Sequence, residues 1–442
     1  MIKSKYIITS ILCLCFCFKI AAQTPQPITL ASVLELSAAN DLTIKAYQLH
    51  QELALAKVVK SKEWWLPEIS VGVQTHQLWG AAMNGNGNFF IDVSRNNLWA
   101  GLGLDANWNF AEGIYTKKAA ELKAQATQYD TKAARNQAIL TNIETYYDFV
   151  TAQLSYQAYQ QLVEQADTIV RQIERQVRAG LRYQSEALLS KSNLNHLKVQ
   201  MLHAKADYGK QSANLVGLLN LDPKTKLVCV DTVIAPLELI NVLTSDFNAV
   251  YEKRPELKSL ELSAQAMETE QLILTKGLLF PELQLNTYGA YFGSLNGDIT
   301  PMVATTDIRQ LYPTTNLNLS LMWKIPLGQL VHGGDLEIAK VEMLLQKNEV
   351  EQVKANINKE ILAAQSALMI AKEQMDIASE GSQLAQMALE QSIQRQALGT
   401  IRPFEILQSQ EIFIKSQLDY LNAVSAFNKS QYQLFVGKGN AL

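Results

Sequence analysis

The sequence has few residues that interrupt or crosslink a polypeptide. Its 442 residues include 11 prolines, 21 glycines and 4 cysteines. Three of the cysteines, Cys13, Cys15 and Cys17, lie near the start of the chain, in a stretch that we expect to be removed. Cys229 then has no partner for an intrachain disulfide, so a small disulfide-stabilised scaffold is excluded.

Neither positive nor negative residues are in large excess. The chain has 39 Lys and Arg against 42 Asp and Glu, with a formal net charge of −3. Without a basic cluster, nothing indicates nucleic-acid binding. Beyond the start of the chain, no segment holds the about 18 consecutive apolar residues that predict a transmembrane helix. If this chain spans a membrane, it does so by strands.

Residues 1–22 have the pattern of a secretory signal peptide. Two lysines precede an apolar core over residues 7–18, and a small-residue cleavage site ends at Ala22. The cysteines of this core follow Leu or Phe rather than a small residue, which argues against lipid attachment there. We expect cleavage after Ala22 and export to the envelope of a bacterium.

The segment 97–110 alternates strictly between apolar and polar or small residues. Its apolar positions are Leu98, Ala100, Leu102, Leu104, Ala106, Trp108 and Phe110. A period of two predicts a strand with one apolar face and one wet face. About 9–11 residues suffice to cross a bilayer, and aromatic residues at the end of the segment suit a membrane interface. Asp105 and Asn107 are expected on the wet face.

The pattern returns at 316–326, with Leu317 and Leu319 on the apolar face and Asn318 on the wet face. Other landmarks of the first half also recur 214 to 219 residues later. The pairs are Pro67 and Pro281, Trp108 and Trp323, Gly113 and Gly328, Gly180 and Gly399, and Glu186 and Glu405. This order indicates an internal duplication.

Long helices are predicted between the repeated strands and the repeated turns. No proline or glycine occurs from about 114 to 179, and at about 1.5 Å per residue such a helix is roughly 100 Å long. Apolar residues at steps of three and four form one stripe, which includes Leu140, Ile143, Tyr147 and Val150. The average period of the stripe is close to that of a straight helix, as the wall of a tube requires.

The chain therefore divides into a signal peptide (1–22), a first repeat (23–230), a connector (231–242) and a second repeat (243–442). The first repeat is expected to hold strands at about 68–79 and 97–110, a loop over 81–96, a long helix at about 114–179 and a return helix at about 184–219. The second is expected to hold strands at about 282–293 and 316–326, a long helix at about 335–397 and a return helix at about 402–434. The fold class is α+β.

This order, used twice, resembles the TolC family of outer-membrane efflux proteins over essentially the whole mature chain. Two local matches add to it, RPELKSLELSAQAMETEQLILTKGLLFPELQL and ALGTIRPFEILQSQEIFIKSQLDYLNAVSAF. The resemblance implies a trimer, in which four strands from each subunit close one 12-stranded outer-membrane β-barrel. A long α-helical coiled-coil tunnel would continue the barrel into the periplasm.

The resemblance also implies a function without enzyme activity or a cofactor. The chain would be the exit duct of a tripartite multidrug efflux system or of a type I secretion system. Its implied partners are two further copies of itself in a homotrimer, a periplasmic adaptor protein, an inner-membrane RND or ABC transporter, and outer-membrane lipid.

Site residues follow from the same resemblance. In the family, helix-hairpin tips meet the adaptor, and acidic residues on the return helix narrow the tunnel entrance. Glu405 matches the first acidic position, whereas Gln408 occupies the second. The expected docking tips comprise Gly180, Leu181, Glu186, Gly399 and Thr400, and the expected lumen-facing residues are Asp105, Asn107 and Asn318.

Other interpretations stay open. A periplasmic adaptor predicts one helical hairpin flanked by soluble β domains, and a structural coiled-coil envelope protein predicts no barrel strands. Glu186 and Glu405 are also typical of acids in the first turn of a helix, where the helix dipole favours them. No catalytic arrangement stands out, and no ligand spacing that would predict a metal site occurs among His50, His76, His196, His203 and His332.

Overall fold

The computed structural model of the chain describes residues 25–83, 86–230, 233–237, 246–294 and 312–442. The expected signal peptide and much of the expected connector lie outside the described residues. The chain forms two compact units. The first contains Met1–Tyr47, Lys132–Arg254 and Ala355–Leu442, and the second contains Gln48–Thr131 and Pro255–Lys354.

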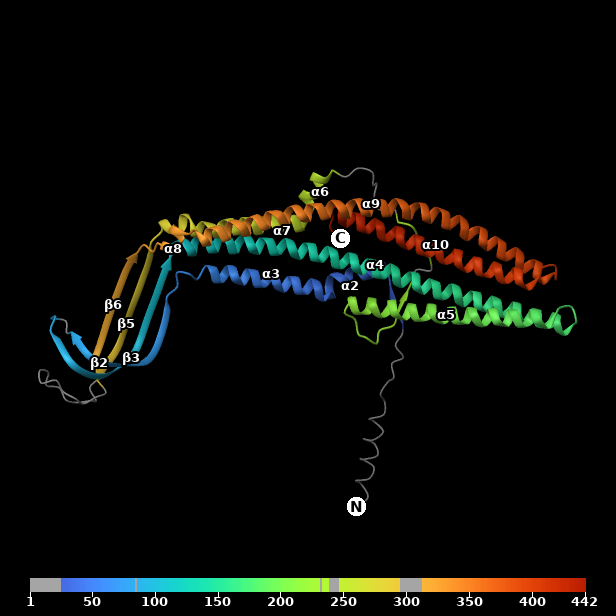
Figure 1. The fold of residues 1–442 in the computed structure, drawn as a ribbon. Helices are drawn as coiled ribbons and strands as arrows, with labels where there is room; N and C mark the ends of the chain where they lie inside the picture. The colour runs from blue at the N-terminus through green and yellow to red at the C-terminus, as the bar shows by residue number, and fades with distance from the viewer. Residues whose placement is uncertain (1–24, 84–85, 231–232, 238–245, 295–311) are drawn as a thin grey trace, which may run out of the picture. The chain divides into compact units, whose positions relative to one another are not determined.

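Four antiparallel strands form the sheet of the second unit (Figure 1). They are β2 (Glu68–Met83), β3 (Phe89–Asn109), β5 (Glu282–Ser294) and β6 (Tyr312–Met322), in the order β2-β3-β5-β6. Asp105 pairs with Glu68 on one side and with Asn286 on the other, and Asn286 pairs with Asn318. Residues directly opposite each other share a face, so these four side chains lie on one face of the sheet.

The loop expected over 81–96 is wrong, because most of this segment is strand. β2 continues to Met83 and β3 begins at Phe89. Glycine and asparagine in the turn suggested a longer loop, although Phe89 and Ile91 already begin the apolar alternation. A register shift follows Gly80, whose φ is 98°, and this glycine accommodates the irregularity that the longer hairpin contains.

The ends of two other elements also differ from the prediction. β6 covers Tyr312–Met322 rather than 316–326. It ends two residues before Lys324, whose ammonium forms an ion pair of 2.5 Å with the carboxylate of Glu282. The long helix α4 (Phe110–Arg178) follows β3 directly, so Phe110 begins a helix instead of ending a strand.

Gly113 lies inside α4, although glycine in a helix interior is usually unfavourable. A Cβ at this position would lie 2.2 Å from Cδ2 of Trp64. The Trp64 ring also meets Phe110 edge to face, with ring centroids 5.7 Å apart. Glycine is therefore required because an indole ring packs directly on the helix backbone.

Two long helical hairpins follow the two pairs of strands. They are α4 (Phe110–Arg178) with α5 (Gln184–Leu218), and α9 (Gly334–Ala397) with α10 (Pro403–Gly437). The shorter elements are β1 (Gln26–Ile28), α2 (Leu30–Asn40), α3 (Leu42–Ser61), β4 (Leu227–Cys229), α6 (Phe247–Lys253), α7 (Pro255–Leu274), η1 (Lys276–Leu279) and α8 (Leu327–Val331). None of the helices in the described part of the chain is both long and apolar enough to cross a membrane.

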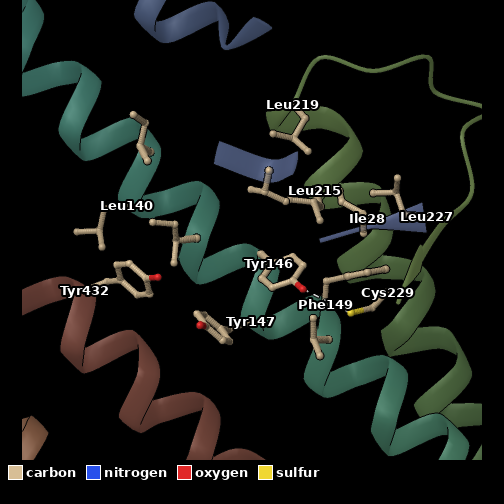
Figure 2. Packing of buried hydrophobic residues seen from close by; sticks show 14 of the residues in the cluster. Ile28, Leu140, Tyr146, Tyr147, Phe149, Leu215, Leu219, Leu227, Cys229 and Tyr432 are labelled. Carbon is tan, nitrogen blue, oxygen red and sulfur yellow. Dashed lines mark hydrogen bonds between the residues drawn. The ribbon is translucent and has the colours of Figure 1, made fainter. Parts of the chain in front are cut away.

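The predicted apolar stripe of α4 is confirmed where it enters the core of the first unit. Leu140, Ile143, Tyr147 and Val150 are all buried, and the same cluster includes Phe149 on a neighbouring face. Figure 2 shows Leu140, Tyr147 and Phe149 of α4 among residues of β1, β4, α5 and α10 that belong to the same cluster. The Gln153 side chain fixes β4, since its Nε2 donates to the carbonyl of Cys229 while its Oε1 accepts from the Cys229 amide.

The interruption between α2 and α3 is held by buried polar contacts. Asp41 accepts hydrogen bonds from the backbone amides of Thr43 and Ile44, which caps α3. Its other carboxylate oxygen accepts from Nδ2 of Asn142, which also donates to Ser37. The helix break and α4 are thus joined by one network of buried hydrogen bonds, which fixes their alignment in the first unit.

Candidate channel wall and hairpin tips

One face of the four-stranded sheet is apolar and exposed. Leu102 on β3 is 57% exposed and Leu319 on β6 is 65% exposed. Other exposed apolar side chains of this face include Ile69, Val71, Val73, Trp79, Tyr291, Leu317 and Leu321. An apolar surface that spans every strand of a sheet is costly in water, so it indicates a surface that another apolar phase covers.

The opposite face is polar, and the structure places the three residues predicted to face a lumen on it. Asp105 and Asn107 alternate with the apolar positions of β3, and Asn318 shares their face through Asn286. Asn286 donates a hydrogen bond from Nδ2 to Asp105.

The tryptophans of the two repeats occupy equivalent places at the helical end of the strands. The indole Nε1 of Trp108 donates to the carbonyl of Trp65 at 2.6 Å, and that of Trp323 donates to the carbonyl of Leu279 at 3.4 Å. In each repeat, this bond joins the end of one strand to the segment that enters the neighbouring strand. The duplication inferred from sequence is therefore also a duplication of contacts.

The turns at the ends of the two hairpins are built alike. Gly180 and Gly399 both have a φ of 71°, in the left-handed region. The amide of Gly180 bonds to the carbonyl of Val177, and that of Gly399 bonds to the carbonyl of Gln396. The amide of the residue after each glycine bonds to the carbonyl one residue earlier in the same helix. Both helices therefore end in a Schellman motif, which favours glycine.

Arg182 joins the two turns and was not predicted from sequence. Its side chain is 9% exposed. Its Nη2 donates to the carbonyl of Ile401 at 2.9 Å and to Oε1 of Gln396 at 3.3 Å, so a residue of the first hairpin holds the turn of the second. Nε and Nη1 remain in the first hairpin, where they donate to Gln176 and Glu186.

The two equivalent acids at the start of the return helices have different surroundings. Glu186 in α5 forms an ion pair of 3.3 Å with Arg182, four residues earlier. Four residues before Glu405 in α10, the corresponding position is the buried apolar residue Ile401. Glu405 is exposed and has no ion-pair partner within the described part of this chain, and Gln408 is exposed one turn further on.

Comparison with known families gives one match. The model of the family described as "Outer membrane efflux protein" matches residues 33–221, which include β2, β3, α4 and α5. Over these residues, the chain is similar to the outer membrane efflux protein family. Comparison with curated proteins gives no match.

Solved structures of outer membrane proteins share the fold of this chain over almost its whole length. The CmeC channel of Campylobacter jejuni is 18% identical, with a TM-score of 0.76 over 95% of this chain and 90% of that one. VceC of Vibrio cholerae is 13% identical, with a TM-score of 0.71 over 93% and 96%. The open MtrE channel of Neisseria gonorrhoeae is 14% identical, with a TM-score of 0.73 over 93% and 89%. The resemblance to the TolC family is thereby confirmed, by the family model over residues 33–221 and by the fold over almost the whole chain.

The hairpin turns expose apolar side chains. Leu181 lies beside Gly180 and Leu398 beside Gly399, and both are exposed, as are Tyr183 and Phe404. The sequence analysis named only Leu181 among these four. All four could have been predicted from the sequence, because each is an apolar residue within five positions of a turn glycine and outside the buried stripe of its hairpin.

One ion pair stabilises the first hairpin near its turn. The ammonium of Lys191 in α5 lies 2.6 Å from Oε1 of Glu174 in α4. Its hydrogen bond and positive charge hold the pKa of Glu174 below its ordinary value. Among the described residues, no group of three or more His, Cys, Asp or Glu side chains is placed to hold a metal ion.

Proposed function

We propose that the protein is the outer-membrane exit duct of a tripartite efflux or type I secretion system. The observation that carries this proposal is the sheet, which has one exposed apolar face, one polar face and two edge strands, β2 and β6. Unpaired strand edges are not tolerated in lipid. Three copies that pair β2 of one chain with β6 of the next would close twelve strands into a barrel, with the polar face inside.

The helical hairpins support the same function over the alternative of a periplasmic adaptor. An adaptor was expected to have one long hairpin, whereas this chain has α4 with α5 and α9 with α10. Three copies would supply six hairpins for the wall of a periplasmic tunnel. The tips would meet an adaptor that belongs to an inner-membrane RND or ABC transporter, through Gly180, Leu181, Glu186, Gly399 and Thr400.

The first test is fractionation and reconstitution. We expect the mature protein in the outer-membrane fraction, as a trimer in mild detergent that separates into monomers on boiling. In a planar lipid bilayer the trimer should produce discrete current steps. A monodisperse monomer that stays in solution without detergent, and adds no conductance, would contradict the proposal.

Glu405 is proposed to line the narrow periplasmic entrance. In a trimer, three of these carboxylates would surround one axis. At an effective dielectric constant near 20 and separations of about 8 Å, each pair would repel by roughly 2 kcal/mol. A bound cation would relieve the repulsion, and among the described residues of one chain no arginine neutralises Glu405 as Arg182 neutralises Glu186.

Glu405→Gln should therefore weaken block of the channel by divalent or trivalent cations in single-channel recordings, with little change in trimer yield. Because Gln408 occupies the second acidic position of the family, the effect is expected to be partial. Glu186→Gln is the matched control, since it removes the equivalent acid of the first repeat and should leave cation block unchanged. Equal cation block in the wild type and in Glu405→Gln would mean that Glu405 serves only as an acid in the first turn of α10.

A further inference from the structure

Three aromatic side chains gather on the otherwise polar face of the sheet. Trp99 of β3 meets Phe292 of β5 with ring centroids 4.5 Å apart and an interplanar angle of 49°. It also meets Tyr288 edge to face, at 5.1 Å and 86°. All three rings are half-buried, so each keeps part of its surface open. The alternation of β3 assigns Trp99 to the wet face, where a bare indole ring has no lipid or core to enter.

The floor beside these rings is formed by glycine and alanine, so no large side chain rises from it. Gly101 and Ala290 form a pair between the aromatic positions of β3 and β5, and Gly72 of β2 pairs with Gly101 on the other side. A Cβ on Gly101 would lie 2.3 Å from the carbonyl oxygen of Gly289, so close strand approach keeps this position empty. The result is an open hollow of about 640 Å³ on the polar face, lined by the three rings, this floor and Asp105.

Carboxylates lie beside the hollow in the part of this face that the structure describes. Asp105 and Glu68 form a register pair on the same face, and both are exposed. Glu282 lies further along this face and is already paired with Lys324. No lysine or arginine occurs among the positions of this face whose side chains the structure describes. Aromatic surfaces and carboxylates therefore lie side by side at the hollow.

We propose that this hollow is a transit-binding site for planar aromatic cations. The proposal rests on the polar face lining the channel, as proposed above. A flat ring system fits over Gly101 and Ala290 and stacks against the exposed ring surfaces, which favours aromatic solutes. A positive charge adds cation–π attraction to Trp99 and attraction to Asp105, whereas an anion of the same shape is repelled. The volume lies within the range of ordinary small-molecule sites.

The test compares two solutes that share one ring system and differ in charge. Reconstituted trimers in a planar bilayer are exposed to 1-pyrenemethylammonium or to 1-pyrenesulfonate while single-channel current is recorded. The ammonium compound should cause transient partial blockades, and the sulfonate should not. Trp99→Ala should shorten the blockades about tenfold, which is the order expected for loss of one desolvated cation–π contact. Trp99→Phe should retain most of the dwell time.

Tyr291→Leu is the matched control, because it removes a ring from β5 on the apolar face, next to Phe292. Its blockades should equal those of the wild type. If Trp99→Ala does not assemble, Tyr288→Leu and Phe292→Leu carry the test, since each keeps an apolar side chain. Conducting wild-type channels without blockade by the ammonium compound, or with equal blockade by the sulfonate, would overturn the transit site while leaving the exit duct intact. An absence of any conductance would instead contradict the proposed function.

Discussion

Leu102→Arg is expected to remove the assembled trimer from the outer membrane, whereas Asp105→Arg is expected to leave it in place. Leu102 lies on the exposed apolar face of β3, and Asp105 lies three residues later on the polar face. An arginine that faces lipid near the bilayer midplane costs roughly 2–4 kcal/mol in each subunit. Three copies in one barrel multiply this cost, while a channel-facing arginine stays hydrated.

The measurement is the yield of heat-dissociable trimer in outer-membrane fractions, at equal levels of total protein. Leu319→Arg on β6 provides an independent repeat of the lipid-facing test in the second half of the chain. Asn318→Arg, one residue earlier, is its matched channel-facing control. If the arginines on the polar face prevented assembly and those on the apolar face did not, the two faces would have to be exchanged.

The sheet was largely predictable because its alternation is local. The sequence alone places Leu102 and Asp105 on opposite faces, because side chains alternate between the two faces of a strand. The ends of strands were less predictable. Asparagine and glycine after Met83 mark a turn, but they do not show that the hairpin continues to Phe89 on the other side. The start of α4 was placed too late, after Gly113. This glycine lies inside the helix because the Trp64 ring packs on it, and the local sequence does not show that contact.

The candidate sites show the same division between local and long-range information. The positive φ of Gly180 and Gly399 follows from glycine at the end of an apolar stripe. Arg182, in contrast, binds Gln396 and Ile401, more than 200 residues away in the sequence, and no periodic pattern predicts such a bond. Trp99 was visible as an aromatic residue on the wet face, but its neighbours became known only from the strand register.

The turns of the two hairpins are expected to be the part of the molecule where a small change abolishes export without loss of the trimer. Replacement of both Gly180 and Gly399 by Trp should have this effect. A Cβ at either position meets nothing within 4 Å, so the new side chains are not excluded by packing. They would place bulky rings beside Leu181 and Leu398 and would force a non-glycine residue into the left-handed region, at a cost of about 1–2 kcal/mol for each turn.

Assembly should survive because the contacts that hold the hairpins lie below the turns. Ile173 of α4, Ala187 of α5 and Ile406 of α10 are buried in one cluster, which the substitutions do not touch. The matched control is Asn at both glycines, since Asn is the side chain that best tolerates a positive φ and adds little bulk. With Asn, trimer yield and export should both stay near the wild-type values.

Export is measured in a strain that lacks the native gene and carries each variant, as susceptibility to a panel of dyes, antibiotics and metal ions. Trimer yield in the outer-membrane fraction is measured in the same cells. The Trp variant should match the deletion strain in susceptibility while its trimer yield equals that of the Asn variant. Full export by the Trp variant would show that the adaptor docks away from these turns. In that case the exposed side chains of Leu181 and Leu398 would need another explanation, since α4 and α9 end beside them without a covering element in the described chain.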